Sequence, residues 1–240
     1  MSALSHPRDH AVQSMFDRIA GRYDLLNRII SFRLDTRWRR RAIRSLLAVK
    51  NPLIVDLGTG TGDLAFDAAK IAGGGARVIG LDFSMEMLRL AERKRLRAER
   101  GPVTSFVQAS ALDVPLKGEI FDGVMTGFVL RNVSDLPRFF TEALRLLKPG
   151  GRFVALDMYL PSRGWFRSLY GIYFFRLMPI IGGLLSDDRK AYRYLSDSVR
   201  RFYSPQAVAE LIERAGFVEV ETEHFLRGAV CLHAAAKPKT

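Results

Sequence analysis

The stretch Val55-Asp56-Leu57-Gly58-Thr59-Gly60-Thr61-Gly62-Asp63 decides how this chain of 240 residues folds. It continues a short apolar run at residues 53–55, typical of a buried strand, and it precedes a helix that we expect to start near Asp63. Glycines let the backbone turn sharply and let a ligand touch the main chain. We therefore expect a binding loop at the carboxyl end of a strand, where parallel sheets bind their ligands.

Strand and helix patterns alternate from this loop to the C-terminus. Apolar runs predict strands at residues 53–55, 77–81, 104–108, 121–126 and 152–156, and amphipathic runs predict helices at residues 63–72, 85–100 and 136–147. A last helix at residues 205–215 precedes strands at residues 218–225 and 229–235, which only Arg227-Gly228 separates, so we expect this pair to be antiparallel. The order predicts an α/β fold: a Rossmann-like seven-stranded sheet, mostly parallel with an antiparallel C-terminal hairpin strand, and with helices on both faces.

We expect one domain spanning residues 1–240. Residues 1–50 form a helical lid, basic and helical in pattern from residue 12 to residue 47, and Asn51-Pro52 ends the helix. Residues 51–157 form the ligand-binding core, and residues 204–240 form the closing helix and strand pair. Between them, residues 158–203 interrupt the alternation with an aromatic-rich insertion that we expect to face the substrate or a membrane.

The composition is that of a globular protein with a strong positive charge. Apolar residues make up 48% and charged residues 26%, which argues against disorder. Lys and Arg number 37 against 25 Asp and Glu, which gives a net charge of +12. Such an excess favours nucleic acid or an anionic membrane surface as a partner, although a solvated basic surface explains it as well.

Several classes of protein are disfavoured by what the sequence lacks. Its single cysteine, Cys231, cannot form an internal disulfide, which fits a reducing cytoplasm, and its apolar neighbours indicate a buried side chain rather than a nucleophile. The N-terminus carries no apolar signal core, and the longest apolar stretch, residues 169–185, is broken by Arg176 and Pro179, so we expect neither export nor a spanning helix. The four histidines show no metal-ligand spacing, and Asp187-Asp188 indicates a helix start, so we expect no metal.

The spacing of the loop distinguishes between two ligand classes. Dinucleotide-binding loops follow G-x-G-x-x-G, whose third glycine falls here at Asp63, a charge that would repel a pyrophosphate at a helix N-terminus. In the pattern D-x-G-x-G-x-G, Asp56 suits the amine of S-adenosylmethionine, and Asp82, 20 residues after Gly62, suits both ribose hydroxyls. With Pro149-Gly150-Gly151 before the fifth strand, the pattern predicts an S-adenosylmethionine-dependent methyltransferase. The alternative is a structural turn with Asp82 as a helix cap.

Segments outside the loop carry a more specific pattern. They are Met15-Phe16-Asp17-Arg18-Ile19-Ala20, Arg22-Tyr23-Asp24, Leu130-Arg131-Asn132-Val133, Asp188-Arg189 and Ala191-Tyr192-Arg193-Tyr194-Leu195. Together they resemble the C-methyltransferases of ubiquinone and menaquinone biosynthesis, of the demethylmenaquinone methyltransferase type, over about residues 12–233. The resemblance implies C-methylation of a polyprenyl quinol, either demethylmenaquinol or the benzoquinol of the ubiquinone pathway, with S-adenosylmethionine as the methyl donor.

The resemblance also implies the cofactor contacts. Together with the loop, the expected cofactor-binding residues are Asp56, Gly58, Gly60, Thr61, Gly62, Asp82, Phe83, Ser110, Ala111 and Phe128. Three positions depart from the family: Ser110 stands where Asn or Asp is usual, Val129 replaces a glycine, and Gly127 replaces a serine. We expect Ser110 to reach the adenine amine through a water and Val129 to narrow the pocket.

A quinol ring carbon becomes a good nucleophile only when a neighbouring hydroxyl loses its proton. We expect Arg131 to stabilise the resulting phenolate, directly or through water, while Asn132 orients a ring oxygen. Because the pKa of a guanidinium exceeds about 12, a bound water is the expected proton carrier. Tyr23, and Tyr192 or Tyr194, are expected to close over the ring. Packing roles for these tyrosines and a structural ion pair at Arg131 are the open alternatives.

Other substrates fit part of the sequence. Basic clusters at residues 37–44 and 89–100 could follow phosphates in an RNA methyltransferase, but no RNA-binding module is present and the aromatic residues are not interleaved with the arginines. We therefore expect no nucleic acid partner. Methylation of a phospholipid headgroup nitrogen and a non-catalytic cofactor-binding protein are the further alternatives.

The insertion suggests how the enzyme meets a polyprenyl substrate. Apolar side chains recur at roughly helical spacing at Trp165, Phe166, Leu169, Tyr170, Tyr173, Phe174, Leu177 and Met178. With Arg163, Arg167 and Arg176 beside them, they predict a helix that docks peripherally on the anionic inner face of a membrane. Alternatively, the stripe packs on the domain's own core or on a second subunit of a homodimer.

Overall fold

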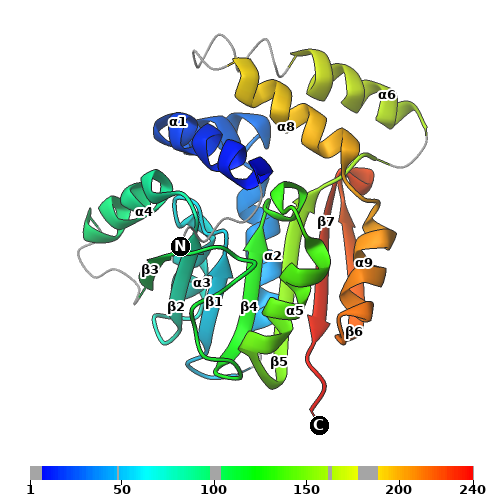
Figure 1. The fold of residues 1–240 in the computed structure, drawn as a ribbon. Coiled ribbons are helices and arrows are strands. Elements are labelled where there is room, and N and C mark those ends of the chain that lie inside the picture. The colour runs from blue at the N-terminus through cyan, green and yellow to red at the C-terminus, as the bar shows by residue number, and fades with distance from the viewer. Residues whose placement is uncertain (1–6, 48, 98–103, 162–163, 178–188, 240) are drawn as a thin grey trace.

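One sheet organises the fold, with its seven strands in the order β3-β2-β1-β4-β5-β7-β6 (Figure 1). The structure, a computed structural model, describes residues 7–47, 49–97, 104–161, 164–177 and 189–239. The strands are β1 (Leu53–Leu57), β2 (Arg77–Asp82), β3 (Thr104–Gln108), β4 (Phe121–Gly127), β5 (Leu147–Met158), β6 (Val218–Phe225) and β7 (Val230–Ala236). β1 to β5 are parallel, whereas β7 is antiparallel to both β5 and β6. The predicted Rossmann-like sheet with an antiparallel C-terminal hairpin strand is therefore confirmed.

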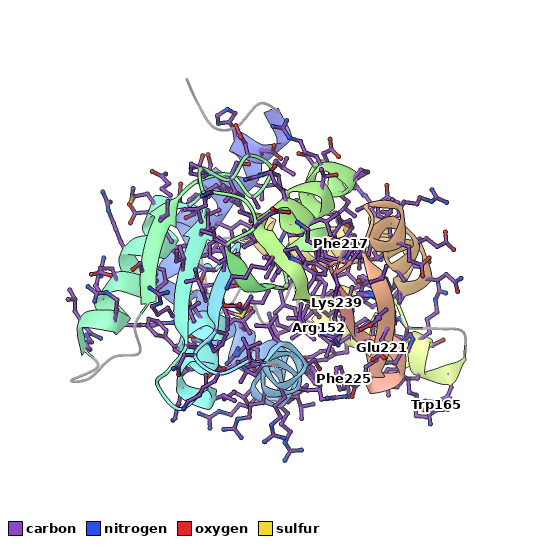
Figure 2. All side chains as sticks on the ribbon, turned by 90° about the horizontal axis from the view of Figure 1, so that it is seen from below. Arg152, Trp165, Phe217, Glu221, Phe225 and Lys239 are labelled. Atoms are coloured by element: carbon purple, nitrogen blue, oxygen red, sulfur yellow. The ribbon has the colours of Figure 1, made fainter. Side chains whose placement is uncertain are left out.

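Helices cover both faces of the sheet, because its central strands are buried along almost their whole length. α2 (Asp35–Leu46) and α3 (Asp63–Ile71) pack on one face, and α5 (Leu136–Leu146) and α9 (Pro205–Arg214) pack on the other, while α4 (Met85–Arg97) lies beside β3 (Figure 1). Phe217 and Phe225 mark the two faces near β6: Phe217 packs on Phe153, and Phe225 stacks on Trp38 (Figure 2).

Another group of helices lies over the carboxyl ends of the parallel strands (Figure 1). It comprises α1 (Pro7–Ile30), α6 (Trp165–Ile172), the short π-helical turn η2 (Tyr173–Leu177) and α8 (Arg189–Arg201). Tyr170, Phe174, Val199 and Ala229 form a small core of their own beneath α6. Because ligands of parallel sheets bind at the carboxyl ends of the strands, these helices lie where they can cover a site.

The N-terminal helical region differs from the single helix that the sequence predicts. Phe32 and Arg33 lie between α1 and α2 at φ values of 51° and 61°, so the region is two helices joined by a tight turn. Neither residue is a glycine or a proline, and the sequence therefore carries no break signal there. The turn lets α2 pack on a face of the sheet while α1 lies over the carboxyl ends of the parallel strands.

The one cysteine lies in β7, in the core. Cys231 is buried, and burial raises the pKa of its thiol to about 12, so the thiol stays protonated. His233 on the same strand contacts the hydroxyls of Tyr159 at 2.8 Å and Thr222 at 3.0 Å, and burial lowers its pKa to about 4. The prediction of a buried Cys231 is confirmed.

Candidate active site

The glycine loop joins β1 to α3 where the strand order reverses. β2 lies on one side of β1 and β4 on the other, which makes this edge the topological switch point of the sheet. Gly58 has a φ of 74°, and a Cβ there would lie 2.5 Å from Cγ2 of Val129. Both the backbone conformation and the close approach of Val129 therefore require a glycine at this position.

Asp82 ends β2 and faces the loop. Its Oδ2 accepts a hydrogen bond from the Gly60 N–H at 2.8 Å, and its Oδ1 accepts one from the Ser84 N–H at 2.8 Å. Burial raises the pKa of this carboxyl to about 6, against the lowering effect of the two donors. A carboxylate oxygen has two lone pairs, so Asp82 can hold the loop and still accept hydrogen bonds from two ligand hydroxyls.

Asp56 lies at the end of β1 beneath the loop. Its Oδ2 accepts a hydrogen bond from the Thr59 hydroxyl at 2.7 Å, whereas its Oδ1 is buried with no hydrogen-bond partner among the described residues. Burial raises the pKa of this carboxyl to about 7, and the charge of Asp82 contributes in the same direction. A buried carboxylate oxygen without a partner is unfavourable, and a cationic ligand would relieve it.

Two adjoining cavities flank these acids, one of about 50 Å³ beside the end of β2 and one of about 80 Å³ over the loop. They share Gly58, Asp82, Phe83, Val129 and Asn132. The predicted cofactor residues that line one or both cavities are Asp56, Gly58, Gly60, Thr61, Asp82, Phe83, Ser110, Ala111 and Phe128. Gly62 lines neither cavity; it precedes the first turn of α3 with a φ of 85°.

The three departures from the family pattern lie at these cavities. Ser110 lines the smaller one, and its hydroxyl accepts a hydrogen bond from the Leu112 N–H at 3.2 Å. Gly127 ends β4 at the larger one. Val129 lines both, and the narrowing that we expect from its side chain stays a prediction.

α1 covers both cavities and is fastened at several points along its length. The Gln13 amide donates to the Phe83 carbonyl at 2.6 Å, and Asp17 accepts from the Ser84 hydroxyl at 2.5 Å. Near its other end, Asp24 accepts from the Thr61 hydroxyl at 2.6 Å. The helix thus binds directly to the loops that follow β1 and β2.

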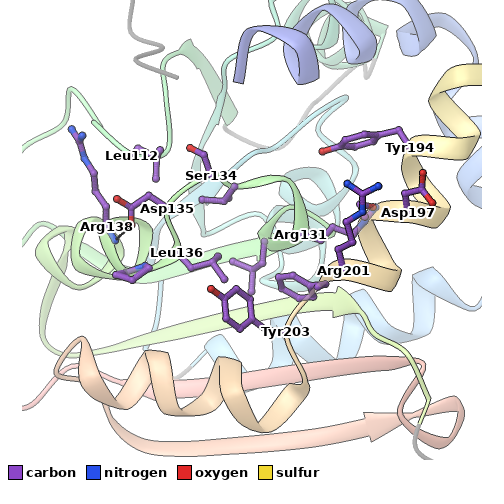
Figure 3. Close-up of a pocket in the computed structure, with 15 residues that line it drawn as sticks. Leu112, Arg131, Ser134, Asp135, Leu136, Arg138, Tyr194, Asp197, Arg201 and Tyr203 are labelled. Atoms are coloured by element: carbon purple, nitrogen blue, oxygen red, sulfur yellow. Dashed lines mark hydrogen bonds between the residues drawn. The ribbon is translucent and has the colours of Figure 1, made fainter. Parts of the chain in front are cut away.

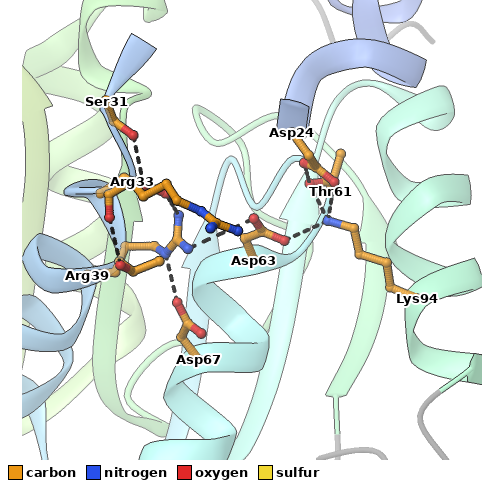
Figure 4. Close-up of polar contacts among 10 residues, drawn as sticks. Asp24, Ser31, Arg33, Arg39, Thr61, Asp63, Asp67 and Lys94 are labelled. Atoms are coloured by element: carbon orange, nitrogen blue, oxygen red, sulfur yellow. Dashed lines mark hydrogen bonds and ion pairs between the residues drawn. The ribbon is translucent and has the colours of Figure 1, made fainter. Parts of the chain in front are cut away.

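Two cations form ion pairs around the glycine loop, and one of them reaches α1 (Figure 4). Lys94 of α4 contacts Asp24 of α1 and Asp63 of α3, each at 2.6 Å. Arg39 of α2 contacts Asp35 at 2.5 Å and Asp67 at 2.7 Å. Sequence patterns could not identify these pairs, since each except Arg39–Asp35 joins separate helices.

The predicted catalytic residues occupy two different places. Tyr23 and Asn132 line the larger cavity over the loop, and burial raises the pKa of Tyr23 so that its hydroxyl remains a donor. Arg131 lies farther in: its Nη1 donates to Asp157 at 2.6 Å and to the Phe128 carbonyl at 2.9 Å. The side chains of this pair are 6% and 0% exposed. The structural ion pair that the sequence left open at Arg131 is therefore present.

Arg131 also borders a polar groove of about 690 Å³ between α5 and α8 (Figure 3). Tyr194 lines this groove together with Arg138, Asp197 and Arg201. Tyr194 does not line the cavities over the glycine loop, but both Tyr194 and Tyr23 lie near enough to Arg131 to raise the pKa of its guanidinium. The side chain of Tyr192 lies outside the described part of the chain.

An apolar cavity of about 290 Å³ adjoins the cavity over the loop. The two share Asn27, Arg39 and Phe128. Its walls come mainly from α1, α2, α6, η2 and α8, with further residues from β5 and from the segments after β4 and β6. Its other apolar lining residues are Ile30, Phe32, Leu34, Trp38, Met158, Phe166, Leu169, Tyr170, Tyr173, Phe174, Leu195 and Leu226. No local sequence pattern predicts this cavity, because its walls are assembled from segments far apart in the chain.

The apolar stripe of the insertion divides between two environments. Tyr170 and Phe174 pack inward beneath α6, which corrects the prediction that they face a membrane. Trp165 is 66% exposed at the outer edge of the molecule (Figure 2). Leu169 and Ile172 are also exposed, and their helical spacing from Trp165 places all three on one side of α6. The predicted Arg163, Met178 and Asp187-Asp188 lie outside the described residues, as does the side chain of Leu177. Within the described ranges, no helix is long and apolar enough to cross a membrane.

Known proteins similar to this chain agree on one family. The sequence profile of the ubiE/COQ5 methyltransferase family matches residues 4–237. The demethylmenaquinone methyltransferase of Thermus thermophilus is 43% identical, over 93% of this chain and all of its own. The ubiquinone/menaquinone biosynthesis C-methyltransferase UbiE of Syntrophotalea carbinolica is 42% identical, over 93% of this chain and 92% of its own.

Solved structures agree on the fold. A SAM-dependent methyltransferase from Thermotoga maritima, described as a possible histamine N-methyltransferase, superimposes with a TM-score of 0.62 and 21% identity, over 93% of this chain and 98% of its own. At that identity the likeness shows the fold alone. The family profile and the relatives match nearly the whole sequence and therefore show the family. This chain therefore belongs to the ubiE/COQ5 methyltransferase family, as its sequence motifs predicted.

Proposed function

We propose that this enzyme transfers a methyl group from S-adenosylmethionine to a ring carbon of a polyprenyl quinol. The names of its relatives in quinone biosynthesis support this substrate class. The observation that carries the proposal is the apolar cavity beside the glycine loop, since it adjoins the acidic cofactor cavity through Asn27, Arg39 and Phe128. A planar ring with an isoprenoid tail fits apolar walls, whereas RNA and a charged headgroup do not.

The methyl donor occupies the two cavities at the loop. Asp82 would accept hydrogen bonds from the ribose hydroxyls, and Phe83, Ser110 and Ala111, which line the smaller cavity, would hold the adenine. The amine of the methionine moiety pairs with Oδ1 of Asp56, the carboxylate oxygen without a partner among the described residues. The apolar cavity adjoins the donor cavities at Asn27, Arg39 and Phe128, so a substrate there would lie next to the methyl donor.

α1 acts as a lid in this scheme. Cavities of about 50 and 80 Å³ are much smaller than the roughly 300 Å³ or more of an ordinary ligand pocket. The proposal therefore includes a movement of α1 that opens the cavities to the donor, and the polar contacts of the helix can re-form afterwards. Lys94 and Asp24 form the latch that holds the end of α1 nearest the loop.

The catalytic roles follow from where charge develops. Loss of a quinol proton leaves a phenolate, and Arg131 supplies a positive charge at the wall of the apolar cavity. Asp157 fixes the guanidinium and offsets part of that charge. Tyr23 and Asn132 orient the ring from the side of the donor. A guanidinium this basic does not take up the quinol proton, so a water carries it away.

The mouth of the apolar cavity provides the contact with the membrane in which polyprenyl quinols reside. Phe32, Leu169 and Leu226 line the cavity and are also exposed, with Phe32 71% exposed. Arg33, Arg167 and Arg227 are exposed beside them, and Arg227 lies 5.0 Å from the ring of Trp165. An apolar rim edged by arginines suits an anionic bilayer surface.

Liposome co-sedimentation tests the membrane contact. The protein should bind anionic vesicles more than neutral ones, and salt should release it, because each arginine near the surface contributes about 1 kcal/mol. Replacing both Trp165 and Leu169 by Ser should abolish binding. Leu96→Ser is the matched control, since Leu96 is exposed on α4, away from the cavity mouth. Failure of the wild type to bind anionic vesicles at low salt would refute this surface.

A side-by-side assay tests the function itself. The purified protein and labelled S-adenosylmethionine are incubated with demethylmenaquinol, with phosphatidylethanolamine and with RNA. Transfer to the quinol alone is the expected result. Transfer to the phospholipid or to RNA, with none to the quinol, would replace the proposal.

A further inference from the structure

Most polar groups at the apolar cavity are already paired within the protein. The Tyr173 hydroxyl donates to the Ile30 carbonyl at 3.2 Å, and the Ser31 hydroxyl donates to Asp35 at 2.8 Å. Tyr170 differs: its hydroxyl oxygen is shielded from solvent and has no hydrogen-bond partner among the described residues. A native structure that buries such a group calls for an explanation, because a hydroxyl gives up its bonds to water on burial.

The ring of Tyr170 is held firmly in the cavity wall. It stacks on Phe174 with ring centroids 5.1 Å apart and an angle of 9° between the planes. The ring of Phe166 also packs against it, with 6.3 Å between the ring centroids, and Tyr170 is only 9% exposed. Because the oxygen of a tyrosine is fixed by its ring, this packing also fixes where the hydroxyl can donate.

The surroundings define the ligand group that this hydroxyl would take. The walls are apolar, and the charge of Arg131 acts on Tyr170, so an oxygen that carries partial or full negative charge is favoured there. Burial raises the pKa of Tyr170 far above its ordinary value, which keeps the hydroxyl a donor rather than a base. An acceptor oxygen on a flat apolar ring meets these conditions.

We propose that the Tyr170 hydroxyl donates a hydrogen bond to a ring oxygen of the quinol and so selects oxygenated rings over hydrocarbons of the same shape. The inference rests on the proposed function, since it names one contact of the same substrate. Tyr170 then joins Arg131 on the ring oxygen, while Tyr23 and Asn132 act from the side of the donor.

Two ligands of one shape test the contact by calorimetry. 2,3-Dimethyl-1,4-naphthoquinone carries ring oxygens and no open site for addition of a thiol, whereas 2,3-dimethylnaphthalene carries no oxygen. Both are titrated into protein saturated with S-adenosylhomocysteine. Tyr170→Phe should weaken quinone binding about tenfold and leave hydrocarbon binding unchanged. The Phe variant keeps the stack on Phe174, and its Tm without ligand should equal or exceed that of the wild type.

Tyr173→Phe is the matched control, because it removes a hydroxyl from the same cavity whose partner is the protein backbone. It should lower the Tm and leave both affinities unchanged. Quinone affinity that is unaltered by Tyr170→Phe, or an equal loss for both ligands, overturns the inference and leaves the proposed function standing. If neither ligand binds the wild type, the assignment of the cavity to a quinol ring falls, and the inference falls with it.

Discussion

Binding of the methyl donor should depend on pH through Asp56. Its pKa of about 7 means that the unliganded protein holds this carboxyl largely protonated below neutral pH. A cationic amine pairs only with the ionised form, so affinity should rise as pH rises through 7. At pH 6 roughly one tenth of Asp56 is ionised and at pH 8 roughly nine tenths, which predicts roughly tenfold tighter binding at pH 8. Asp82, with a pKa of about 6, adds about a further factor of two.

The same pKa shifts give the sign for stability. Between the unfolded value near 4 and the folded values of about 6 and 7, the folded protein binds more protons than the unfolded chain. These two carboxyls therefore lower the stability of the unliganded protein as pH rises through that window. Binding of the methyl donor should remove the loss of stability that ionisation of Asp56 causes, because its amine pairs with the carboxylate.

Isothermal calorimetry with S-adenosylhomocysteine, which carries the same amine and ribose, measures this linkage. Titrations at pH 6 in buffers of different ionisation enthalpy should show the release of about 1.4 protons, about 0.9 from Asp56 and about 0.5 from Asp82. Asp56→Asn should bind more weakly at pH 8 and should keep only the twofold dependence due to Asp82. A wild-type affinity that is constant from pH 6 to pH 8 would refute the pairing of Asp56 with the amine. The same holds if the affinity of Asp56→Asn changes with pH as much as that of the wild type.

Three further substitutions probe the rest of the site. Arg131→Ala leaves Asp157 buried without its ion pair and should lower the free energy of unfolding by about 3–5 kcal/mol in urea titrations. The same variant should turn over substrate more slowly while its affinity for the methyl donor stays nearly intact. A loss of stability under about 1 kcal/mol would contradict the buried ion pair. Asp82→Ala should weaken donor binding by about 1–3 kcal/mol in calorimetry, because it removes the acceptor of the ribose hydroxyls; unchanged affinity in a folded protein would exclude that role. Lys94→Met should speed hydrogen exchange of the α1 amides, since it unfastens Asp24, and unchanged exchange would mean that Lys94 is no latch.

The elements that the sequence predicted well are those with local signals. The glycine loop and the strand-end acids combine spacing with a known backbone requirement, so their positions in the fold follow directly. The antiparallel pairing of the last two strands was also predicted, but residues 226–229 join them rather than Arg227-Gly228 alone. The expected cofactor residues rest partly on the loop pattern and partly on the family resemblance, and all except Gly62 line the two cavities.

The features that escaped prediction depend on contacts between distant segments. Asp157 is an ordinary strand residue in sequence, and only the fold brings it within 2.6 Å of Arg131. The apolar cavity is lined by helices and connecting segments that lie far apart in the chain. Tyr170 follows Leu169 in the same apolar helical pattern, yet Tyr170 is buried and Leu169 is exposed. Periodicity places a residue on a helix but does not say which neighbour covers it.

The most direct test of the central claim is the position of the transferred methyl group. The enzyme is incubated with S-adenosylmethionine carrying a carbon-13 methyl group and with demethylmenaquinol, either reduced or oxidised, and the product is examined by NMR. The proposal predicts a labelled methyl bonded to a ring carbon, formed from the quinol and not from the quinone. A label bonded to oxygen or nitrogen, or equal transfer to the oxidised ring, would contradict it.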